Sequence, residues 1–487
     1  MKEAIEGLEP RLMWEHFYQI SQIPRCSKEE DKIREYVINF AKKMGLEYKV
    51  DNVGNVVIKK AATPGKEKKP TVVLQGHMDM VCEKNKSTEH DFTKDAIRLV
   101  RDGDWITADG TTLGADNGIG VAAALAVLES TDLVHGPVEA LFTIDEETGL
   151  TGANEIAPDM LEGRILLNMD SEEDGALYIG CAGGKDTEIY LDIETEAVPK
   201  GFRTVQIKLS GLAGGHSGLN IHEGRGNAVK LLNRFLWKTL PQVGGRLASF
   251  EGGSKHNAIP READAIVFLP EQKLETLKEI SAEYDAIYKN ELKAIDPNVK
   301  LEILESGFNV PEKMFSSELH NKLLNLLYVI PHGVIAMSHA VPGLVETSTN
   351  LAVVGVKNGK ISILTSQRSS VGSELVDIND MVQVCGFQAD AEVHSGGGYP
   401  AWQPNPDSAI LHRSKKVYQD LFGKEPEVKA IHAGLECGII GSKFAGMDMI
   451  SFGPTIEGAH SPDERVQISA VEKFWKFVEA LLADLAA

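Results

Sequence analysis

The sequence has few cysteines, and their pattern is not that of a disulfide framework. Five cysteines stand at positions 26, 82, 181, 385 and 437 of 487 residues. Because the number is odd and the spacing wide, we expect reduced thiols, as in the cytosol. Cys437, in the segment HAGLECG, lacks the local signature of a catalytic nucleophile, so we expect it to be a buried core residue.

Positive charge and long hydrophobic runs are also scarce. The chain has 50 lysines and arginines against 71 acids, a net charge of −21, which disfavours nucleic acid and anionic membranes as partners. The longest apolar stretch, 121–128, is far shorter than the roughly 20 residues of a membrane span. The N-terminal segment lacks the apolar core and cleavage site of a signal peptide. We therefore expect a cytoplasmic protein with neither nucleic acid nor a membrane as its partner.

The length and the apolar pattern predict an α/β domain with a large insertion. A chain of 487 residues exceeds what one core usually organises. Continuous apolar runs at 71–75, 138–144 and 164–169 alternate with helical patterns. They are typical of strands buried on both faces, in a mostly parallel central sheet with helices on both faces. We assign residues 1–186 and 397–487 to this domain.

The middle of the chain, residues 187–396, has a different pattern. Alternating strands surround an amphipathic helix at 227–240, and a similar arrangement recurs between 350 and 395. This predicts an inserted α+β domain, which we interpret as two related α+β units. The Gly/Pro-rich segment 394–406 marks its end.

Potential metal ligands follow each predicted strand of the first domain. The positions are His77, Asp79, Glu146, Glu147, Asp170 and His460, with Asp116 at the start of a predicted helix. Because the carboxyl ends of parallel strands meet at one edge of a sheet, we expect these side chains to lie together. Singly, each acid could be a turn former or a helix cap. Together the acids would repel and raise one another's pKa unless a cation neutralised them, so the sequence predicts a metal site.

The kind and number of ligands indicate two metal ions. Histidine with carboxylates suits zinc, and also manganese or cobalt. There are more ligands than one tetrahedral zinc with an open position needs, so two ions about 3.5 Å apart that share a carboxylate are expected. Asp79, two residues after His77, could orient that imidazole. Glu146 and Glu147 are adjacent, so one could bind metal while the other faces a water molecule.

The motifs GHMDM, TLGADNG, DEETG, NMDSE and GAH resemble those of the co-catalytic zinc peptidases, a superfamily that includes glutamate carboxypeptidases, aminoacylases and cytosolic dipeptidases. Within it, QGHMDMVCEKN, ADGTTLGADNGIG, LLNMDSEEDG and CAGG are most similar to the aminoacyl-histidine dipeptidases. This group is also called Xaa-His, β-alanyl-histidine or cytosol non-specific dipeptidases. The resemblance spans almost the whole chain.

The resemblance implies a role for each motif residue. The ligands of two Zn²⁺ per chain, for which Mn²⁺ or Co²⁺ could substitute, would be His77, Asp116, Glu147, Asp170 and His460, with Asp116 bridging. Glu146 would be the general base and Asp79 would orient His77. The reaction implied is hydrolysis of dipeptides, including Xaa-His dipeptides such as carnosine, by a metal-bridging hydroxide. Residues 1–186 and 397–487 would then be the two parts of the catalytic domain.

By the same resemblance, residues 187–396 would form a lid domain. His216 in GLAGGHSG would stabilise the developing oxyanion, and Asn257 and Arg368 would hold the substrate backbone and its C-terminal carboxylate. His432 and the segment HAGLECG receive no role. The side-chain preference, the physiological metal and the choice between monomer and homodimer stay open.

Three functions other than that of a dipeptidase share some of these sequence features. The same architecture could serve an N-acyl amino acid deacylase or a carboxypeptidase, because metal chemistry does not name the acyl group. A non-catalytic small-molecule binding protein could retain the site, but intact Glu146 argues against it. A nucleotide-binding enzyme is discounted, since the chain has neither GxxxxGK[ST] nor GxGxxG.

Overall fold

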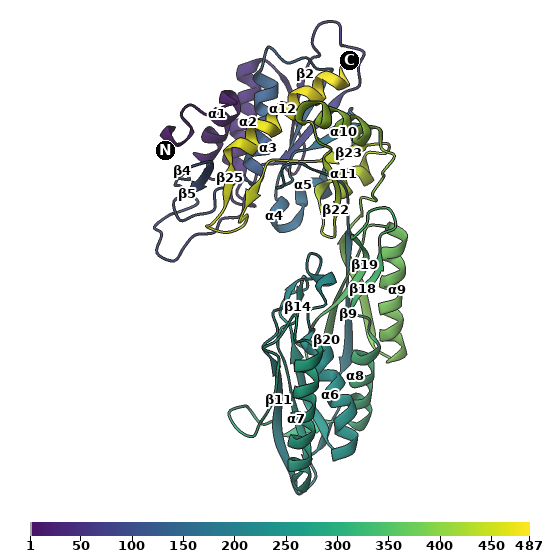
Figure 1. Ribbon diagram of the computed structural model, residues 1–487. Coiled ribbons are helices and arrows are strands. Elements are labelled where there is room, and N and C mark those ends of the chain that lie inside the picture. The colour runs from purple at the N-terminus through teal and green to yellow at the C-terminus, as the bar shows by residue number, and fades with distance from the viewer. Residues whose placement is uncertain (1) are drawn as a thin grey trace. The chain divides into compact units, whose positions relative to one another are not determined.

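The computed structural model describes residues 2–487, which form two compact units (Figure 1). Unit 1 comprises Met1–Gly180, Pro404–Ala430 and Leu435–Ala487. Unit 2 comprises Cys181–Gln403 and the short segment Ile431–Gly434. The range 187–396 expected for the inserted domain therefore lies inside the first segment of unit 2.

Unit 1 is built on an eight-stranded sheet of order β1-β2-β6-β3-β7-β23-β8-β22. Its strands are β1 (Glu47–Val50), β2 (Val56–Lys60), β3 (Val72–His77), β6 (Val138–Thr143), β7 (Ile165–Asn168), β8 (Ala176–Cys181), β22 (Glu427–Ile431) and β23 (Asp448–Ser451). The four central strands, β6, β3, β7 and β23, are parallel, whereas β2 and β8 join this block antiparallel. The predicted α/β class is confirmed, with the parallel part confined to the centre of the sheet.

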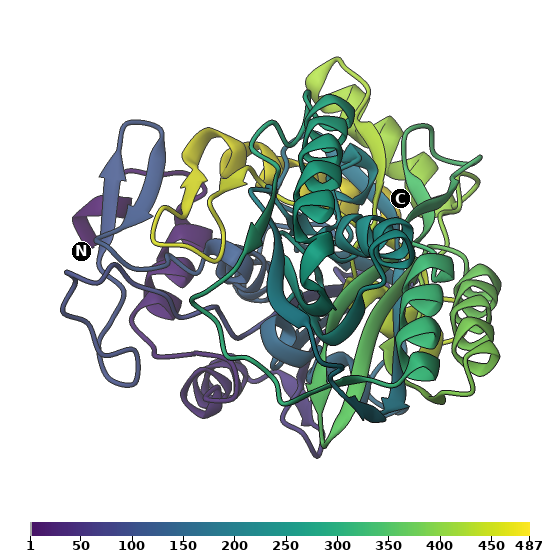
Figure 2. The ribbon, with the colours of Figure 1, turned by 90° about the horizontal axis from the view of Figure 1, so that it is seen from below.

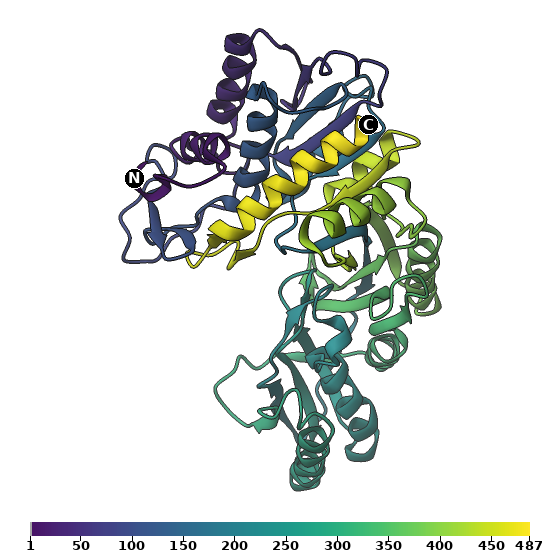
Figure 3. The same ribbon diagram turned by 45° about the horizontal axis from the view of Figure 1, so that its top comes forward.

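The central strands are buried because helices cover them. Every residue of β3 and β6 is buried, which explains their unbroken apolar runs. Helix α3 (Ala115–Glu129) packs on β3, and α1 (Arg11–Ser21) packs on α3. Helix α10 (Ala409–Phe422) packs on β23 and on α12 (Ile468–Leu485). Figure 3 shows how α12, in yellow, returns to the blue and purple elements of the first 180 residues.

Four further helices belong to unit 1. α2 (Asp31–Met44) packs on β1 and β2, and the shorter helices are α4 (Glu146–Gly149), α5 (Thr151–Glu155) and α11 (Glu436–Lys443). A separate four-stranded sheet has the order β24 (Ile456–Glu457), β25 (Arg465–Gln467), β5 (Trp105–Ala108) and β4 (Leu99–Asp102). This second sheet carries the chain that follows His460.

Unit 2 has a nine-stranded sheet made of two halves with the same succession of elements. One half contains β11 (Phe202–Ser210), α6 (Ala228–Val243), β13 (Arg246–Gly252), β15 (Ala263–Pro270), α7 (Leu274–Glu291) and β16 (Lys300–Leu304). The other contains β9 (Gly183–Asp192), α8 (Ser317–Val329), β19 (Val345–Lys357), β20 (Lys360–Ser369), α9 (Gly372–Gln388) and β21 (Glu392–Tyr399). Both halves are β-α-β-β-α-β, ordered β16-β11-β15-β13 and β19-β20-β9-β21, and they meet where β13 pairs with β19. The ninth strand, β18 (Gly333–Met337), pairs with β19 and lies outside this linear order.

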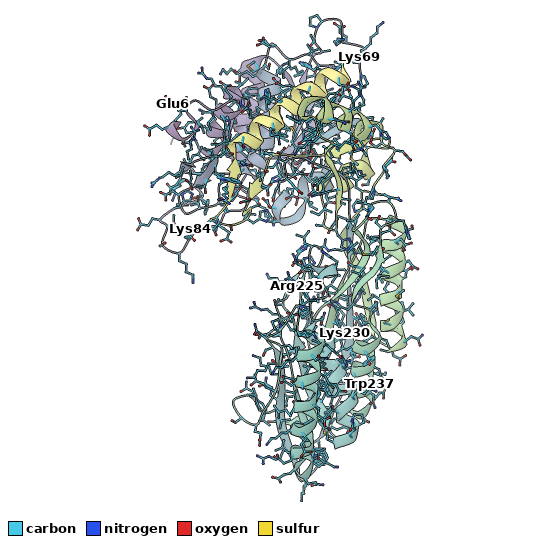
Figure 4. The ribbon with its side chains drawn as sticks, viewed as in Figure 1. Glu6, Lys69, Lys84, Arg225, Lys230 and Trp237 are labelled. Carbon is cyan, nitrogen blue, oxygen red and sulfur yellow. A yellow bond between two sulfur atoms is a disulfide. The ribbon has the colours of Figure 1, made fainter. Side chains whose placement is uncertain are left out.

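Helices of the two halves of unit 2 are joined through α6. Nζ of Lys230 donates to the carbonyl oxygens of Leu327, Tyr328 and Ile330, where α8 ends, and burial lowers the pKa of Lys230 to about 8. About two turns further along α6, the ring of Trp237 lies 4.9 Å from the ring of Tyr328. Lys230 and Trp237 are labelled in Figure 4, and Figure 2 shows the teal and green helices from below. These contacts tie α8 of one half to α6 of the other.

Cys26 and Cys82 form a disulfide, so the expectation of reduced thiols is wrong for this pair. The backbone of Cys26 pairs with that of Met80, which brings the two cysteine Cα atoms to 5.7 Å across 56 positions of sequence. Number and spacing of cysteines could not reveal this, because the path of the chain decides which ones meet. Cys437 is buried, as expected. Each helix among residues 2–487 is too short or too polar to cross a membrane.

Candidate active site

The carboxyl edge of the unit 1 sheet carries the predicted metal ligands. His77 ends β3, Glu146 and Glu147 begin α4 directly after β6, and Asp170 follows β7 by two residues. Asp116 lies in the first turn of α3. His460 lies in the loop between β24 and β25, on the separate small sheet.

Two clusters of potential ligands share Asp116. The first contains His77, Asp116 and Asp170, and the second contains Asp116, Glu147 and His460. Oδ1 of Asp116 is 3.1 Å from Nε2 of His77, and Oδ2 is 3.1 Å from Nε2 of His460. Asp170 completes the first cluster with Oδ1 3.4 Å from His77, and Glu147 the second with Oε2 3.0 Å from His460. The two oxygens of one carboxylate therefore serve different clusters.

Asp79 lies behind His77, on the side away from the clusters. Its Oδ1 is 3.3 Å from Nδ1 of His77, whereas the other ring nitrogen faces Asp116. The same carboxylate accepts the backbone N–H groups of Glu146 and Glu147 and the hydroxyl of Ser27. Although burial opposes ionisation, these partners lower the pKa of Asp79 to about 2. Asp79 is thus a charged carboxylate that lies where it could orient the imidazole.

Glu146 has the properties of a group that can exchange protons. Burial, together with the charges of Asp170, Glu436 and Glu147, raises its pKa well above the ordinary value of a glutamate. Asp79 holds its backbone N–H at 3.1 Å. A carboxylate whose pKa is raised in this way binds a proton more readily than an exposed glutamate does.

The chemistry of this set fits two divalent cations. Burial and the charges of Asp116 and Glu147 raise the pKa of Asp170 to about 6. Oε1 of Glu147 and Oδ1 of Asp170 are buried without a hydrogen-bond partner among the described residues. Buried, mutually repelling carboxylates with unused lone pairs are what a cation stabilises. Two imidazoles and three carboxylates are a donor set that zinc accepts.

The surroundings of His216 in unit 2 keep its imidazole neutral and determine which ring nitrogen carries the proton. His216 belongs to β12 (Gly215–His216), which pairs with β14 (Ala258–Ile259). Nδ1 of its ring accepts the backbone N–H groups of Gly218 and Leu219, each at 3.1 Å. Burial, with the positive charges of Arg368 and His256, lowers the pKa of His216 to about 4. The proton of the neutral ring is therefore on Nε2, which leaves a hydrogen-bond donor.

Of the other predicted residues of unit 2, Asn257 lies in the turn before β14 and Arg368 lies on β20. The pairing of β12 with β14 brings Asn257 beside His216, and both line a pocket of about 740 Å³. Arg368 on β20 is buried and donates from Nη1 to the hydroxyl of Tyr399 at 2.8 Å. Its strand partner Ser348 bonds Nε2 of His432 at 2.7 Å.

His432 also fixes the loop after His216. Its carbonyl oxygen lies 2.2 Å from where a Cβ at position 218 would be, so glycine is required at Gly218. Burial and the charge of Arg368 lower the pKa of His432 to about 3, so its ring is neutral. His432 thus connects the His216 loop to the strand pair that carries Arg368.

Comparisons with known proteins show the family of this chain. The family model described as peptidase family M20/M25/M40 matches residues 73–484. The chain belongs to this family. The predicted resemblance to co-catalytic zinc peptidases is confirmed.

Individual members of the family match this M20 peptidase along its whole length. The cytosol non-specific dipeptidase of Escherichia coli (strain K12) is 44% identical over 483 residues, which cover 99% of each chain. The crystal structure of aminoacylhistidine dipeptidase from Vibrio alginolyticus has a TM-score of 0.91 and 44% identity, again over 99% of each chain. The aminopeptidase PepT from Bacillus cereus ATCC 10987 has a TM-score of 0.56 and 14% identity, over 99% of this chain and 100% of that one. PepT shows that the fold is shared.

Glu436 interacts electrostatically with His77, Asp79 and Asp170 of this M20 peptidase, but it is not among the residues predicted from the sequence. Glu436, in HAGLECG, is fully buried at the start of α11. Its Oε2 accepts from Nε2 of Gln75 at 2.6 Å and from Oγ1 of Thr143 at 2.7 Å. Burial raises its pKa to about 7. An acid between apolar residues in that segment was the available signal, but its position beside the predicted strands that became β3 and β6 could not be inferred.

Proposed function

We propose that this M20 peptidase is a dinuclear zinc dipeptidase. The five metal ligands are His77, Asp116, Glu147, Asp170 and His460. The observation that carries the proposal is the division of the Asp116 carboxylate between two clusters, each with a histidine and a further acid. The zinc identity follows from the mixed imidazole and carboxylate donors, and Mn²⁺ or Co²⁺ could replace it.

Glu146 acts as the general base of the proposed reaction. Bound divalent ions would polarise the scissile carbonyl and lower the pKa of an attacking water from 15.7 towards about 7. Glu146 takes the proton of that water and then gives it to the leaving amine, for which its raised pKa is suited. Asp79 keeps Nε2 of His77 directed at the first cluster.

The residues of unit 2 act on the substrate in this proposal. His216 donates from Nε2 to the oxyanion that develops when the carbonyl is attacked. Asn257 binds the substrate backbone, and the guanidinium of Arg368 binds the C-terminal carboxylate, which limits the substrate to a dipeptide. Unit 2 would thus act as a lid domain.

The substrate class and the location complete the proposal. Dipeptides, including Xaa-His dipeptides such as carnosine, are supported by the names of the relatives from Escherichia coli and Vibrio alginolyticus. The cytoplasm is supported by the name of the first of these relatives, which is a cytosol dipeptidase.

The test is hydrolysis of a substrate panel by the zinc-loaded protein. The panel contains carnosine, other Xaa-His dipeptides, unrelated dipeptides, a tripeptide and an N-acetyl amino acid, with amine release as the readout. Glu146→Gln keeps the size of the side chain but removes the base, and the exposed Glu155→Gln is the matched control. We expect dipeptide cleavage to fall by about 10²–10⁴-fold in Glu146→Gln alone, with two zinc ions retained in both variants.

The panel also separates the alternatives. Cleavage of the N-acetyl amino acid alone would replace the dipeptidase by a deacylase. If wild-type protein with two bound zinc ions cleaves no member of the panel, the chain is a binding protein. Equal activity of Glu146→Gln and wild type would refute the assignment of the base.

A further inference from the structure

A buried carboxylate outside the predicted ligand set holds the segment that carries Asp116. The side chain of Glu464 accepts four consecutive backbone N–H groups. Oε2 accepts from Leu113 at 2.7 Å and Gly114 at 2.9 Å, and Oε1 from Ala115 at 2.8 Å and Asp116 at 3.2 Å. Both oxygens are thus used in full to fix one short stretch of main chain.

This stretch needs an external support because helical geometry does not set it. Asp116 has φ −77° and ψ 113°, outside the helical region, although it lies in the first turn of α3. Regular helix hydrogen bonds therefore begin only after it. Glu464 supplies the acceptors that fix the main chain at Asp116.

Arg25 holds the same stretch from the opposite side. Its buried guanidinium donates from Nη2 to the carbonyl oxygen of Gly114, whose N–H binds Glu464. Gly114 has φ +71°, and a Cβ there would lie 2.5 Å from Nη2 of Arg25. The peptide groups of Gly114 are thus hydrogen-bonded on one side to the buried cation Arg25 and on the other to the buried anion Glu464. The positive φ and the close approach of Arg25 require glycine at this position.

The two charged residues also link the three segments that supply ligands. Nη1 of Arg25 donates to the carbonyl oxygens of Met78, at 3.0 Å, and Asp79, at 2.7 Å, directly after the ligand His77. Glu464 stands four residues after the ligand His460 and is anchored to β5 by Oγ1 of Thr107, which donates to its carbonyl oxygen at 2.8 Å. The segments of His77, Asp116 and His460 are therefore connected through one buried pair.

We propose that Arg25 and Glu464 are positioning residues that set the location of Asp116 between the two metal ions. The proposal rests on the metal site proposed above. Neither side chain contacts a predicted ligand atom, so both act through the main chain of the ligand segments. Residues that orient metal ligands in this way typically change metal affinity by about 10–100-fold when altered.

The experiment measures zinc affinity by competition with a chromophoric chelator, using the full chain. Glu464→Gln removes one acceptor oxygen and turns an N–H₂ towards backbone N–H groups, and Arg25→Lys removes the fork that spans the two segments. The exposed Asp463→Asn loses a negative charge one residue away and is the matched control. His460→Ala, which deletes a proposed ligand, reports on the site itself.

We expect Glu464→Gln and Arg25→Lys to bind zinc about 10–100-fold more weakly than wild type, and Asp463→Asn to stay within about twofold. Circular dichroism of the metal-free variants reports on the fold separately. Wild-type zinc affinity in either folded variant, even with a lowered melting temperature, would make the pair merely structural and overturn the proposal. Failure of both variants to fold with saturating zinc would overturn it as well. Unchanged affinity in His460→Ala would instead refute the proposed metal site.

Discussion

Nδ1 of His77 lies 3.3 Å from Oδ1 of Asp79, two residues further along the chain. The same carboxylate accepts the backbone N–H groups of Glu146 at 3.1 Å and Glu147 at 3.2 Å. One buried acid therefore lies beside a proposed metal ligand and holds the segment that carries the proposed general base. Its removal should disturb binding of metal and catalysis together.

Asp79→Asn tests this relationship. An amide has one acceptor oxygen where the carboxylate has two, so it cannot serve the imidazole and both backbone N–H groups. We expect zinc affinity to fall by about 10–100-fold, as measured by chelator competition. The exposed Asp102→Asn is the control. Wild-type affinity in Asp79→Asn would show that His77 is oriented by other groups.

His216→Asn tests the neutral donor at Nε2. The amide of asparagine ends short of the position of Nε2, so the donor at that position is lost. We expect kcat to fall by about 10²–10³-fold with little change in KM. Because the pKa of His216 is lowered to about 4, its ring stays neutral as the pH falls from 9 to 5. Wild type and variant should therefore show kcat profiles of the same shape above pH 5.5. The exposed His222→Asn is the control, and an acid limb near pH 6 that vanishes in His216→Asn would contradict the neutral state.

Arg368→Lys tests recognition of the C-terminal carboxylate. The lysine keeps the charge but loses the planar fork that binds a carboxylate through two parallel hydrogen bonds. We expect kcat/KM for dipeptides to fall about 10–100-fold, in line with ~1.5–3 kcal/mol for a hydrogen bond to a charged group. Dipeptide amides should be affected much less. Arg203→Lys, exposed near the start of β11, is the control, and an equal loss on amides would refute the role of Arg368.

Protonation of His320 is expected to lower the free energy of unfolding in mild acid. This histidine is buried on α8, where Nδ1 accepts the backbone N–H of Leu247, and burial lowers its pKa to about 4. An unfolded histidine has a pKa of about 6.5, so protons bind preferentially to the unfolded state between these values. Neutral His320 therefore contributes up to about 3 kcal/mol to the free energy of unfolding. This contribution is fully present above pH 6.5 and is lost as the pH falls towards 4.

Urea unfolding at pH 7.5 and pH 5 measures this contribution. His320→Gln keeps an acceptor for Leu247 but does not titrate, so its midpoint should change less with pH than that of wild type. The exposed His412→Gln should behave like wild type. Identical pH dependence in His320→Gln and wild type would assign the acid sensitivity to other groups.

Much of the fold and of the metal site could be predicted from short-range patterns. The apolar runs that became β3, β6 and β7 are unbroken because their strands are buried on both faces, and the acids and histidines follow them directly. The rule that parallel strands present their carboxyl ends at one edge then brings His77, Glu147 and Asp170 together. His460 was also expected after a strand of the first domain, but it lies in the loop between β24 and β25 of the separate small sheet.

Local sequence alone determined which residues could bind metal and which segments could be buried strands, because periodicity and residue chemistry act over a few positions. Only the tertiary structure decided which distant residues meet. The Cys26–Cys82 disulfide, the grip of Arg25 and Glu464 on Gly114, and the place of Glu436 beside Gln75 all join segments that are far apart in sequence. The physical reason is that such contacts depend on the full path of the chain. A charged side chain is buried and needs hydrogen-bond partners only when the folded main chain surrounds it, and local sequence does not show this.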